Sequence, residues 1–169
     1  KYLSKDDKSN RTIFGDAASA TLISDNGIAK IKDFVLGSDG SGANNLIVRN
    51  SGSVYNDSYN NYLFMNGPEI FTFTLKSVPN LIESVLLKHN IKKENIDLFI
   101  FHQANKFMLN HLRKKIKIDQ DKFYLFISQV GNTVSSTVPI ALYHAINDNK
   151  IKNGDKVVLA GFGVGYSWG

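Results

Sequence analysis

His102 is the side chain in this sequence whose position most favours chemistry. It follows the apolar run 98–101 and comes just before the expected start of a helix. Ligands of open α/β sheets gather at the carboxyl ends of strands, and a helix N-terminus nearby disfavours an imidazolium. The ring is therefore expected to be neutral and able to donate a hydrogen bond to a developing oxyanion. A histidine satisfied within the core is the alternative, and position alone does not separate the two.

Two other segments offer donors for the same kind of oxygen. Asn132 lies between an expected strand and an expected helix, where its amide could donate, although turn asparagines are common after glycine. Gly163, Val164 and Gly165 lie in a glycine-rich turn after the last apolar run. Too few residues follow this turn for the helix and acid of a dinucleotide loop. Its backbone N–H groups can still point at an anion, as in an oxyanion hole.

Basic side chains gather at the end of the helix expected over residues 106–117, namely Arg113, Lys114, Lys115 and Lys117. A solvated helix end explains them, and docking of an anionic partner is the alternative. No pair of histidines has metal-ligand spacing, and the sequence has no cysteine, which excludes a disulfide, a cysteine metal site and thiolate catalysis by this chain. We predict neither a metal nor a cofactor.

Composition places the chain among ordinary globular proteins. It has 169 residues, 43% of them apolar and 21% charged, with a formal net charge of +5. We find no run of membrane-spanning length and no signal segment, so we expect a cytoplasmic protein without membrane contact. No basic-aromatic, zinc or recognition-helix pattern supports nucleic-acid binding.

Apolar periodicity predicts helices at about 68–88, with Pro79 inside, at 106–117, with Asn105 as N-cap, and at 139–147, opening near Pro139. It predicts strands at 28–36, 98–101, 123–127 and 157–160, a buried strand at 21–23 and a short one at 62–65. Segments 1–12, 37–42 and 49–61 are expected to be loops. Strands that alternate with helices indicate a mostly parallel sheet.

Six stretches, taken in order, resemble the motifs of one family. They are Phe14-Gly15-Asp16-Ala17-Ala18-Ser19-Ala20, Ser38-Asp39-Gly40, Met65-Asn66-Gly67-Pro68-Glu69-Ile70-Phe71, His102-Gln103-Ala104-Asn105, Gly131-Asn132-Thr133 with Val138-Pro139, and the closing segment 161–169. The family is β-ketoacyl-acyl carrier protein synthase III, within the thiolase superfamily. The resemblance covers residues 13–169, nearly the whole chain.

The resemblance implies an α/β, thiolase-like fold, of which this chain is the C-terminal half, a mixed five-stranded sheet with helices on its faces. Residues 1–27 would end the N-terminal half and residues 28–169 would form the C-terminal one. The family is usually homodimeric. The helix at 139–147, or the one from Pro68, would be covered by the missing half, and its exposed apolar face would promote association.

The resemblance also implies an acyltransferase of fatty acid biosynthesis that condenses an acyl group from acyl-CoA with malonyl-acyl carrier protein. His102 and Asn132 match the donors that hold the malonyl thioester oxygen. The turn at Gly163, Val164 and Gly165 matches the segment that donates a backbone N–H at the acyl group.

Three departures from the family pattern qualify this expectation. The family nucleophile is a cysteine and this chain has none, so it is expected to be an excised fragment, inactive alone. Phe107 replaces a carrier-binding arginine, although Lys106, Lys114 and Lys115 remain as candidates for docking acyl carrier protein. Residues 134–137 replace smaller, alanine-rich ones. A synthase-III-like acyltransferase of a specialised pathway and a non-catalytic binding module are therefore alternatives.

Overall fold

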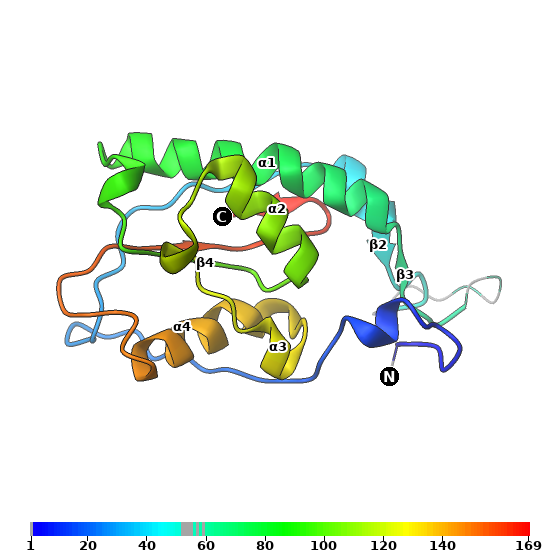
Figure 1. Ribbon diagram of the computed structural model, residues 1–169. Helices are drawn as coiled ribbons and strands as arrows, with labels where there is room; N and C mark the ends of the chain where they lie inside the picture. The colour runs from blue at the N-terminus through cyan, green and yellow to red at the C-terminus, as the bar shows by residue number, and fades with distance from the viewer. Residues whose placement is uncertain (1, 52–55, 57, 59) are drawn as a thin grey trace.

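A computed structural model describes all residues except 1, 52–55, 57 and 59, so part of the expected loop at 49–61 lies outside the described residues. Figure 1 shows three layers, with α1 (Gly67–Lys88) and α2 (Lys106–Ile116) on one side of the strands and α4 (Thr137–Asn147) on the other. The remaining helical turns are α3 (Ile127–Val130), η1 (Asn10–Thr12), η2 (Gly40–Asn45), η3 (Lys93–Asn95), η4 (Gln120–Lys122) and η5 (Val134–Ser136).

The middle layer is a mixed sheet built from short strands. β4 (Leu98–Phe101) pairs in parallel with β5 (Val157–Ala160), while β1 (Gly37–Ser38), β7 (Ser167–Trp168) and β6 (Phe162–Gly163) form an antiparallel ladder in that order. Gly161 joins β5 to β6, and its N–H donates to the carbonyl oxygen of Gly169 at 2.7 Å. A parallel bridge between Phe99 and Phe123 adds a further segment beside β4. The expected α/β arrangement, with parallel and antiparallel strands between helices, is thus present, although the strands pair in separate short ladders. β2 (Leu46–Ile47) and β3 (Phe64–Met65) pair separately.

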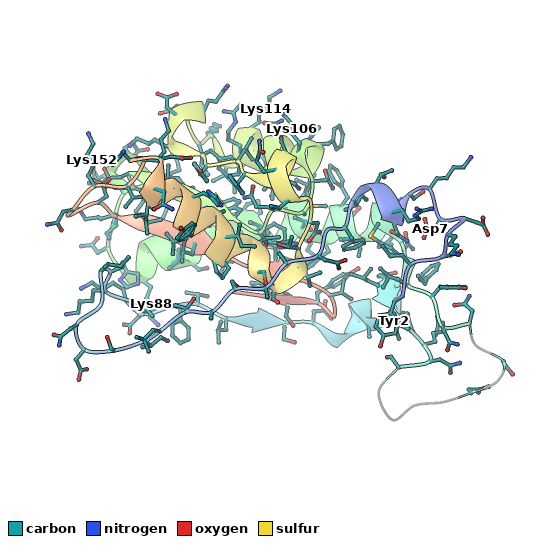
Figure 2. All side chains as sticks on the ribbon, turned by 90° about the horizontal axis from the view of Figure 1, so that it is seen from below. Tyr2, Asp7, Lys88, Lys106, Lys114 and Lys152 are labelled. Carbon is teal, nitrogen blue, oxygen red and sulfur yellow. The ribbon has the colours of Figure 1, made fainter. Side chains whose placement is uncertain are left out.

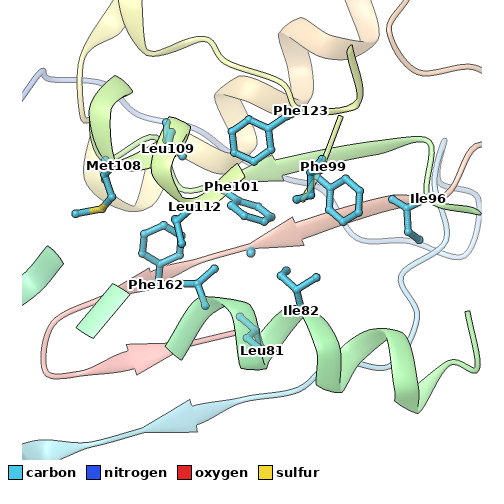
Figure 3. Close-up of a cluster of buried hydrophobic side chains, with 14 residues drawn as sticks. Leu81, Ile82, Ile96, Phe99, Phe101, Met108, Leu109, Leu112, Phe123 and Phe162 are labelled. Atoms are coloured by element: carbon cyan, nitrogen blue, oxygen red, sulfur yellow. The ribbon is translucent and has the colours of Figure 1, made fainter. Parts of the chain in front are cut away.

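β4 is buried on both faces, as its continuous apolar sequence predicts. Because side chains alternate along a strand, Phe99 and Phe101 point into the core beneath α1 and α2, whereas Leu98 and Ile100 pack against α4. Figure 3 shows the first of these clusters, in which Ile82 of α1 faces the phenylalanines of β4. The strand that carries His102 at its end is therefore held rigidly from both sides.

The three predicted long helices are confirmed, and α1 and α2 each begin at a capping asparagine, whereas α4 begins two residues before Pro139 without a side-chain cap. The Asn66 side chain accepts from the Glu69 N–H at the start of α1, and the Asn105 side chain accepts from the Met108 N–H at 2.8 Å to cap α2. Contrary to the expectation that no run is long enough, α1 has the length and composition of a membrane-spanning helix, with a mean hydropathy of 1.3. Its Val78 and Ile82 are fully buried in the core, so this helix also packs against the strands.

Several predicted strands are wrong. Residues 21–23 and 28–36 contain no strand, and residues 16–34 are exposed throughout. Ile28 is 92% exposed, because no neighbouring strand pairs with this segment in the described part of the chain. Only Phe123 of the expected strand 123–127 makes a bridge, and Ile127 begins α3 instead. The expected loop 37–42 contains β1 and the start of η2.

Candidate active site

His102 lies at the carboxyl end of β4, as its place in the sequence predicts. Its backbone N–H donates to the Ala160 carbonyl oxygen at 2.7 Å, which extends the β4–β5 ladder by one residue. The Phe162 ring meets the imidazole edge-to-face, with ring centroids 5.4 Å apart. The imidazole is thus held by its own backbone at the end of β4 and by Phe162 of β6, the strand that follows β5.

The imidazole is also held by the segment that leads into α4. His102 Nδ1 lies 2.6 Å from Thr137 Oγ1, and the Thr137 hydroxyl lies 2.9 Å from the Val134 carbonyl oxygen. Thr137 is 1% exposed and is the first residue of α4. The expected neutral state of His102 fits this enclosure. Burial lowers its pKa to about 4, and a hydrogen bond from the ring to the Val134 backbone opposes the effect only in part.

Asn132 is placed so that its amide N–H groups remain available. Its Oδ1 accepts from the Val134 N–H at 2.9 Å, which leaves the Nδ2 N–H groups as donors without a hydrogen bond to the described residues. Its backbone is held by Ile13 and Gly15: the Asn132 N–H donates to the Ile13 carbonyl at 2.9 Å, and the Gly15 N–H donates to the Asn132 carbonyl at 3.0 Å.

Two glycines make this contact with residues 13–15 possible. A Cβ on Gly15 would overlap the Val130 carbonyl oxygen, so only glycine permits this approach of the two backbones. Gly131 has a φ of +71°, a conformation that glycine adopts at little cost. The small-residue stretch that opens at Phe14 therefore has a structural task, which is to hold the Asn132 loop.

His102 and Asn132 are joined through one hydrogen-bonded loop. The contacts run from His102 to Thr137, from Thr137 to the Val134 carbonyl, and from the Val134 N–H to Asn132. Val134 is the centre of this loop and has a φ of +57°. For a β-branched residue that is a strained conformation, of the kind that clusters at functional sites.

The glycine-rich turn begins directly after a residue that contacts His102. Gly163 follows Phe162, whose ring contacts His102, and Val164 and Gly165 form the turn between β6 and β7. Tyr166 anchors the turn, because its ring stacks on Phe73 with centroids 3.9 Å apart and its backbone exchanges hydrogen bonds with Asp39.

The three candidate docking lysines all lie exposed on α2, and Figure 2 shows Lys106 and Lys114 on the same side of the molecule. Lys106 opens the helix, and Lys114 and Lys115 lie in its last turn, about 12 Å further along the axis. Lys115 also borders a groove along α1 that neither His102 nor Asn132 lines. Phe107, at the position of the missing arginine, is 65% exposed and packs on Phe71 and His111.

Sequence reasoning missed three residues around His102, namely Gln103, Phe162 and Thr137. Gln103 is 1% exposed; its amide donates to the Phe101 carbonyl and accepts from the Phe126 N–H at 2.8 Å, so it ties the end of β4 to the segment before α3. The motif His102-Gln103-Ala104-Asn105 was the available signal for Gln103. No local pattern marks the contact between Thr137 and His102, which lie 35 positions apart.

Within the described residues, no group of three His, Asp or Glu side chains could hold a metal ion. The arrangement can instead present two neutral hydrogen-bond donors from side chains, with a backbone turn close by. Such donors stabilise negative charge that develops on an oxygen atom.

Comparison with known proteins agrees with the fold and the motif order, which define a thiolase-like α/β chain. The chain superposes on a crystal structure of a 3-oxoacyl-(acyl-carrier-protein) synthase III with a TM-score of 0.84 and 40% identity, covering 99% of this chain and 55% of that one. For the Thermus thermophilus β-ketoacyl-acyl carrier protein synthase III the TM-score is 0.73, at 33% identity over 80% of this chain and 43% of that one.

Residues 86–169 match the family model of the 3-oxoacyl-[acyl-carrier-protein] synthase III C terminal. The β-ketoacyl-[acyl-carrier-protein] synthase III of Clostridium perfringens strain ATCC 13124 is 37% identical over all of this chain and 54% of its own length. That of Clostridium tetani is 35% identical over 96% of this chain and 52% of its own length. The chain therefore belongs to the synthase III family and corresponds to its C-terminal part. It spans about half the length of the curated relatives it matches.

Proposed function

We propose that this chain is the condensing half of a 3-oxoacyl-acyl carrier protein synthase III that acts in fatty acid biosynthesis. The observation that carries the proposal is the hydrogen-bonded loop that joins a neutral His102 to an Asn132 whose amide N–H groups are left available. The synthase III relatives, at 35–37% identity, support the substrate class by their names.

In the proposed reaction, an acyl group from acyl-CoA is first held as a cysteine thioester. Malonyl-acyl carrier protein then loses carbon dioxide, and the electron pair of the broken C–C bond forms an enolate whose oxygen accepts hydrogen bonds from His102 and Asn132. The enolate carbon attacks the acyl thioester carbonyl, and the cysteine thiolate leaves. Both donors bind the enolate oxygen more strongly than the thioester carbonyl, so they lower the barrier to decarboxylation. One such donor is worth on the order of 3 kcal/mol.

The acyl thioester carbonyl also becomes an oxyanion during the attack. We assign its stabilisation to a backbone N–H of the turn at Gly163, Val164 and Gly165. The support is the contact of Phe162 with His102, which places the start of this turn beside the imidazole.

The nucleophile has to come from outside these residues, because the sequence has no cysteine. We propose that residues 28–169 pair with an N-terminal half to which residues 1–27 belong, that the whole is a homodimer, and that it works in the cytoplasm. The exposed apolar side chains between residues 22 and 36 support the pairing with an N-terminal half, since they are left without a covering partner in this structure.

The decisive experiment uses the longer protein that contains this chain and the cysteine half. In His102→Ala, self-acylation by acyl-CoA should persist, as read from intact mass, while malonyl decarboxylation falls by roughly a hundredfold or more. Loss of self-acylation as strong as the loss of condensation would contradict the role of His102. The acyl group that adds to the unaltered protein would identify the primer.

Asn132→Asp is the sharper partner variant. A carboxylate oxygen can still accept from the Val134 N–H, so the loop is retained, but the Nδ2 donor becomes a second negative oxygen. We expect loss of decarboxylation, together with a lower thermal stability because the new carboxylate is largely buried. Retained decarboxylation would remove Asn132 from the mechanism.

We further propose that acyl carrier protein docks on α2 through Lys106, Lys114 and Lys115, with the aromatic surface of Phe107 in place of an ionic contact. The exposure of the three lysines and of Phe107 supports this. Lys114→Glu with Lys115→Glu should raise the KM for carrier protein and weaken its salt dependence. An unchanged KM would rule out this surface.

A non-catalytic binding module is the second candidate, favoured by the absence of cysteine. The gene upstream of Lys1 separates the two. An in-frame cysteine-bearing half supports the condensing enzyme, whereas a start codon immediately before Lys1 supports the module.

A further inference from the structure

The Thr137 hydroxyl lies between two partners that compete for its single proton. One is His102 Nδ1 at 2.6 Å and the other is the Val134 carbonyl oxygen at 2.9 Å. A carbonyl oxygen can only accept a hydrogen bond, whereas a neutral imidazole nitrogen either donates or accepts. The direction in which this hydroxyl donates therefore decides which nitrogen of His102 carries the proton.

Two arrangements of the protons are possible, and in both the Val134 carbonyl oxygen still accepts from the Thr137 backbone N–H. If Thr137 donates to the Val134 carbonyl, its oxygen accepts from Nδ1–H, and Nε2 is left with a lone pair. If Thr137 donates to Nδ1 instead, the ring proton is on Nε2, and Nε2 becomes a hydrogen-bond donor. A rotation of one hydroxyl, together with the ring proton's move, thus changes His102 from an acceptor to a donor at its outer nitrogen.

We propose that Thr137 is a positioning residue that gives His102 access to the Nε2–H tautomer, the form that can donate to a substrate oxygen. This inference rests on the proposed function, because a donating Nε2–H matters for catalysis only if His102 binds the substrate oxygen. The tautomer itself is a property of the free chain and can be measured without substrate.

The structure around Thr137 suits this task. The side chain is 1% exposed, so water does not compete for the hydroxyl, and a β-branched residue within a helix has few χ1 rotamers available. The strained φ of +57° at Val134 belongs to the residue whose carbonyl is the competing acceptor. Phe162 contacts the imidazole edge-to-face, which limits the ring to one orientation.

Removing the Thr137 hydroxyl should favour the Nδ1–H tautomer of His102. The Val134 backbone already interacts with His102 in the direction that favours a protonated ring nitrogen. In Thr137→Val the Val134 carbonyl keeps the backbone N–H of residue 137 as a donor but loses the hydroxyl, so its second lone pair is left for His102 Nδ1–H, which has itself lost the threonine oxygen as its acceptor. We therefore expect Thr137→Val to fix the Nδ1–H tautomer and to leave Nε2 unprotonated, whereas Thr137→Ser keeps the wild-type behaviour.

The test is ¹⁵N NMR of the imidazole nitrogens in the histidine-labelled full chain at neutral pH, with His102→Gln used to assign the signals. Thr137→Val should move the Nδ1 and Nε2 shifts to those of a single Nδ1–H tautomer, and Thr137→Ser should not. Thr74→Val is the matched control. Thr74 is also 1% exposed, and its hydroxyl donates to the Ile70 carbonyl at 2.7 Å within α1, away from His102.

Wild-type imidazole shifts in Thr137→Val, or a move to the Nε2–H tautomer, would overturn the proposal whatever the protein's activity. In the longer protein, kcat for condensation should fall roughly tenfold or more in Thr137→Val, with KM and self-acylation unchanged and recovery in Thr137→Ser. A fall in kcat without a tautomer change would also overturn it. The His102→Ala experiment decides the proposed function separately, since it does not depend on Thr137.

Discussion

At the scale of single residues, His102 combines a buried ring with a pKa lowered to about 4. The ring is thus neutral at physiological pH. A neutral imidazole can donate a hydrogen bond at one nitrogen while its other nitrogen is oriented by a fixed partner, which is the arrangement found with Thr137.

This lowered pKa predicts a defined pH dependence of stability. Between about pH 6.5 and pH 4 the unfolded state binds a proton that the folded state does not, so stability should fall as the pH is lowered through this window and level off below it. The full difference amounts to about 3 kcal/mol. Urea unfolding at several pH values should show this loss, and His102→Asn should lack it. An imidazole that titrates near pH 6.5 in the folded chain would contradict the burial argument.

The positions that sequence predicted correctly have local causes. His102 follows the end of an apolar strand and Asn105 caps a helix, as expected, whereas the catalytic role of His102 stays a prediction. Thr137 was missed because its importance depends on a contact across 35 positions. The orientation of the Asn132 amide was equally hidden, since it depends on the conformation of Val134.

At the scale of elements, the loop that carries Asn132 into α4 contains a residue type that is poorly suited to its conformation. Val134→Gly should relieve the strain of a β-branched residue at a φ of +57° and raise the free energy of unfolding by about 1 kcal/mol. The same change at Val138, inside α4, should lower it by at least as much. Thermal unfolding of both variants tests the pair, and a loss of stability in both would show that Val134 is not strained.

The contact between residues 13–15 and the Asn132 loop gives a second element-scale prediction. Gly15→Ala puts a Cβ against the Val130 carbonyl and should cost about 1–3 kcal/mol, with altered Asn132 side-chain amide signals. Gly67→Ala, at the start of α1 where a Cβ would meet nothing within 4 Å, should instead leave the protein as stable or slightly more so. Equal effects at both glycines would mean that the close approach does not matter.

Helices were easier to predict than strands, for a physical reason. A helix such as α1 satisfies its own backbone, so its apolar periodicity and its Asn66 cap suffice to identify it. A strand needs a partner, and sequence does not show whether one is present. Residues 98–101 pair with β5 on one side and, through Phe99, with Phe123 on the other, whereas residues 28–36 pair with no strand in the described part of the chain.

At the scale of the whole molecule, apolar side chains along residues 22–36 are left on the surface. They are Leu22, Ile23, Ile28, Ile31, Phe34 and Leu36, each at least 62% exposed. Figure 1 shows this segment running outside the layers, from beneath α4 around to α1. Exposed apolar surface of this extent marks an interaction site or a cause of self-association.

We therefore expect the isolated chain to associate as its concentration rises. Leu22→Ser with Ile28→Ser should reduce this association in sedimentation velocity. Asp25→Ser with Lys30→Ser is the control, because it changes the same segment without altering the net charge or the apolar surface. A monomeric wild-type chain, or equal association in both double variants, would contradict the expectation.

The attachment of this outer segment has a mechanical consequence. Residues 16–34 are exposed along their whole length, yet the stretch just before them is fastened to Asn132 by the two backbone hydrogen bonds of Ile13 and Gly15. The exposed segment is thus attached at this end to Asn132, one of the two proposed hydrogen-bond donors. At its other end the segment is held to α1, because Lys88 Nζ donates to the Phe34 carbonyl at 3.1 Å and His89 Nε2 lies 2.7 Å from the Asp33 carbonyl oxygen. A pull on residues 16–34 would therefore load the Asn132 loop at one end and the end of α1 at the other.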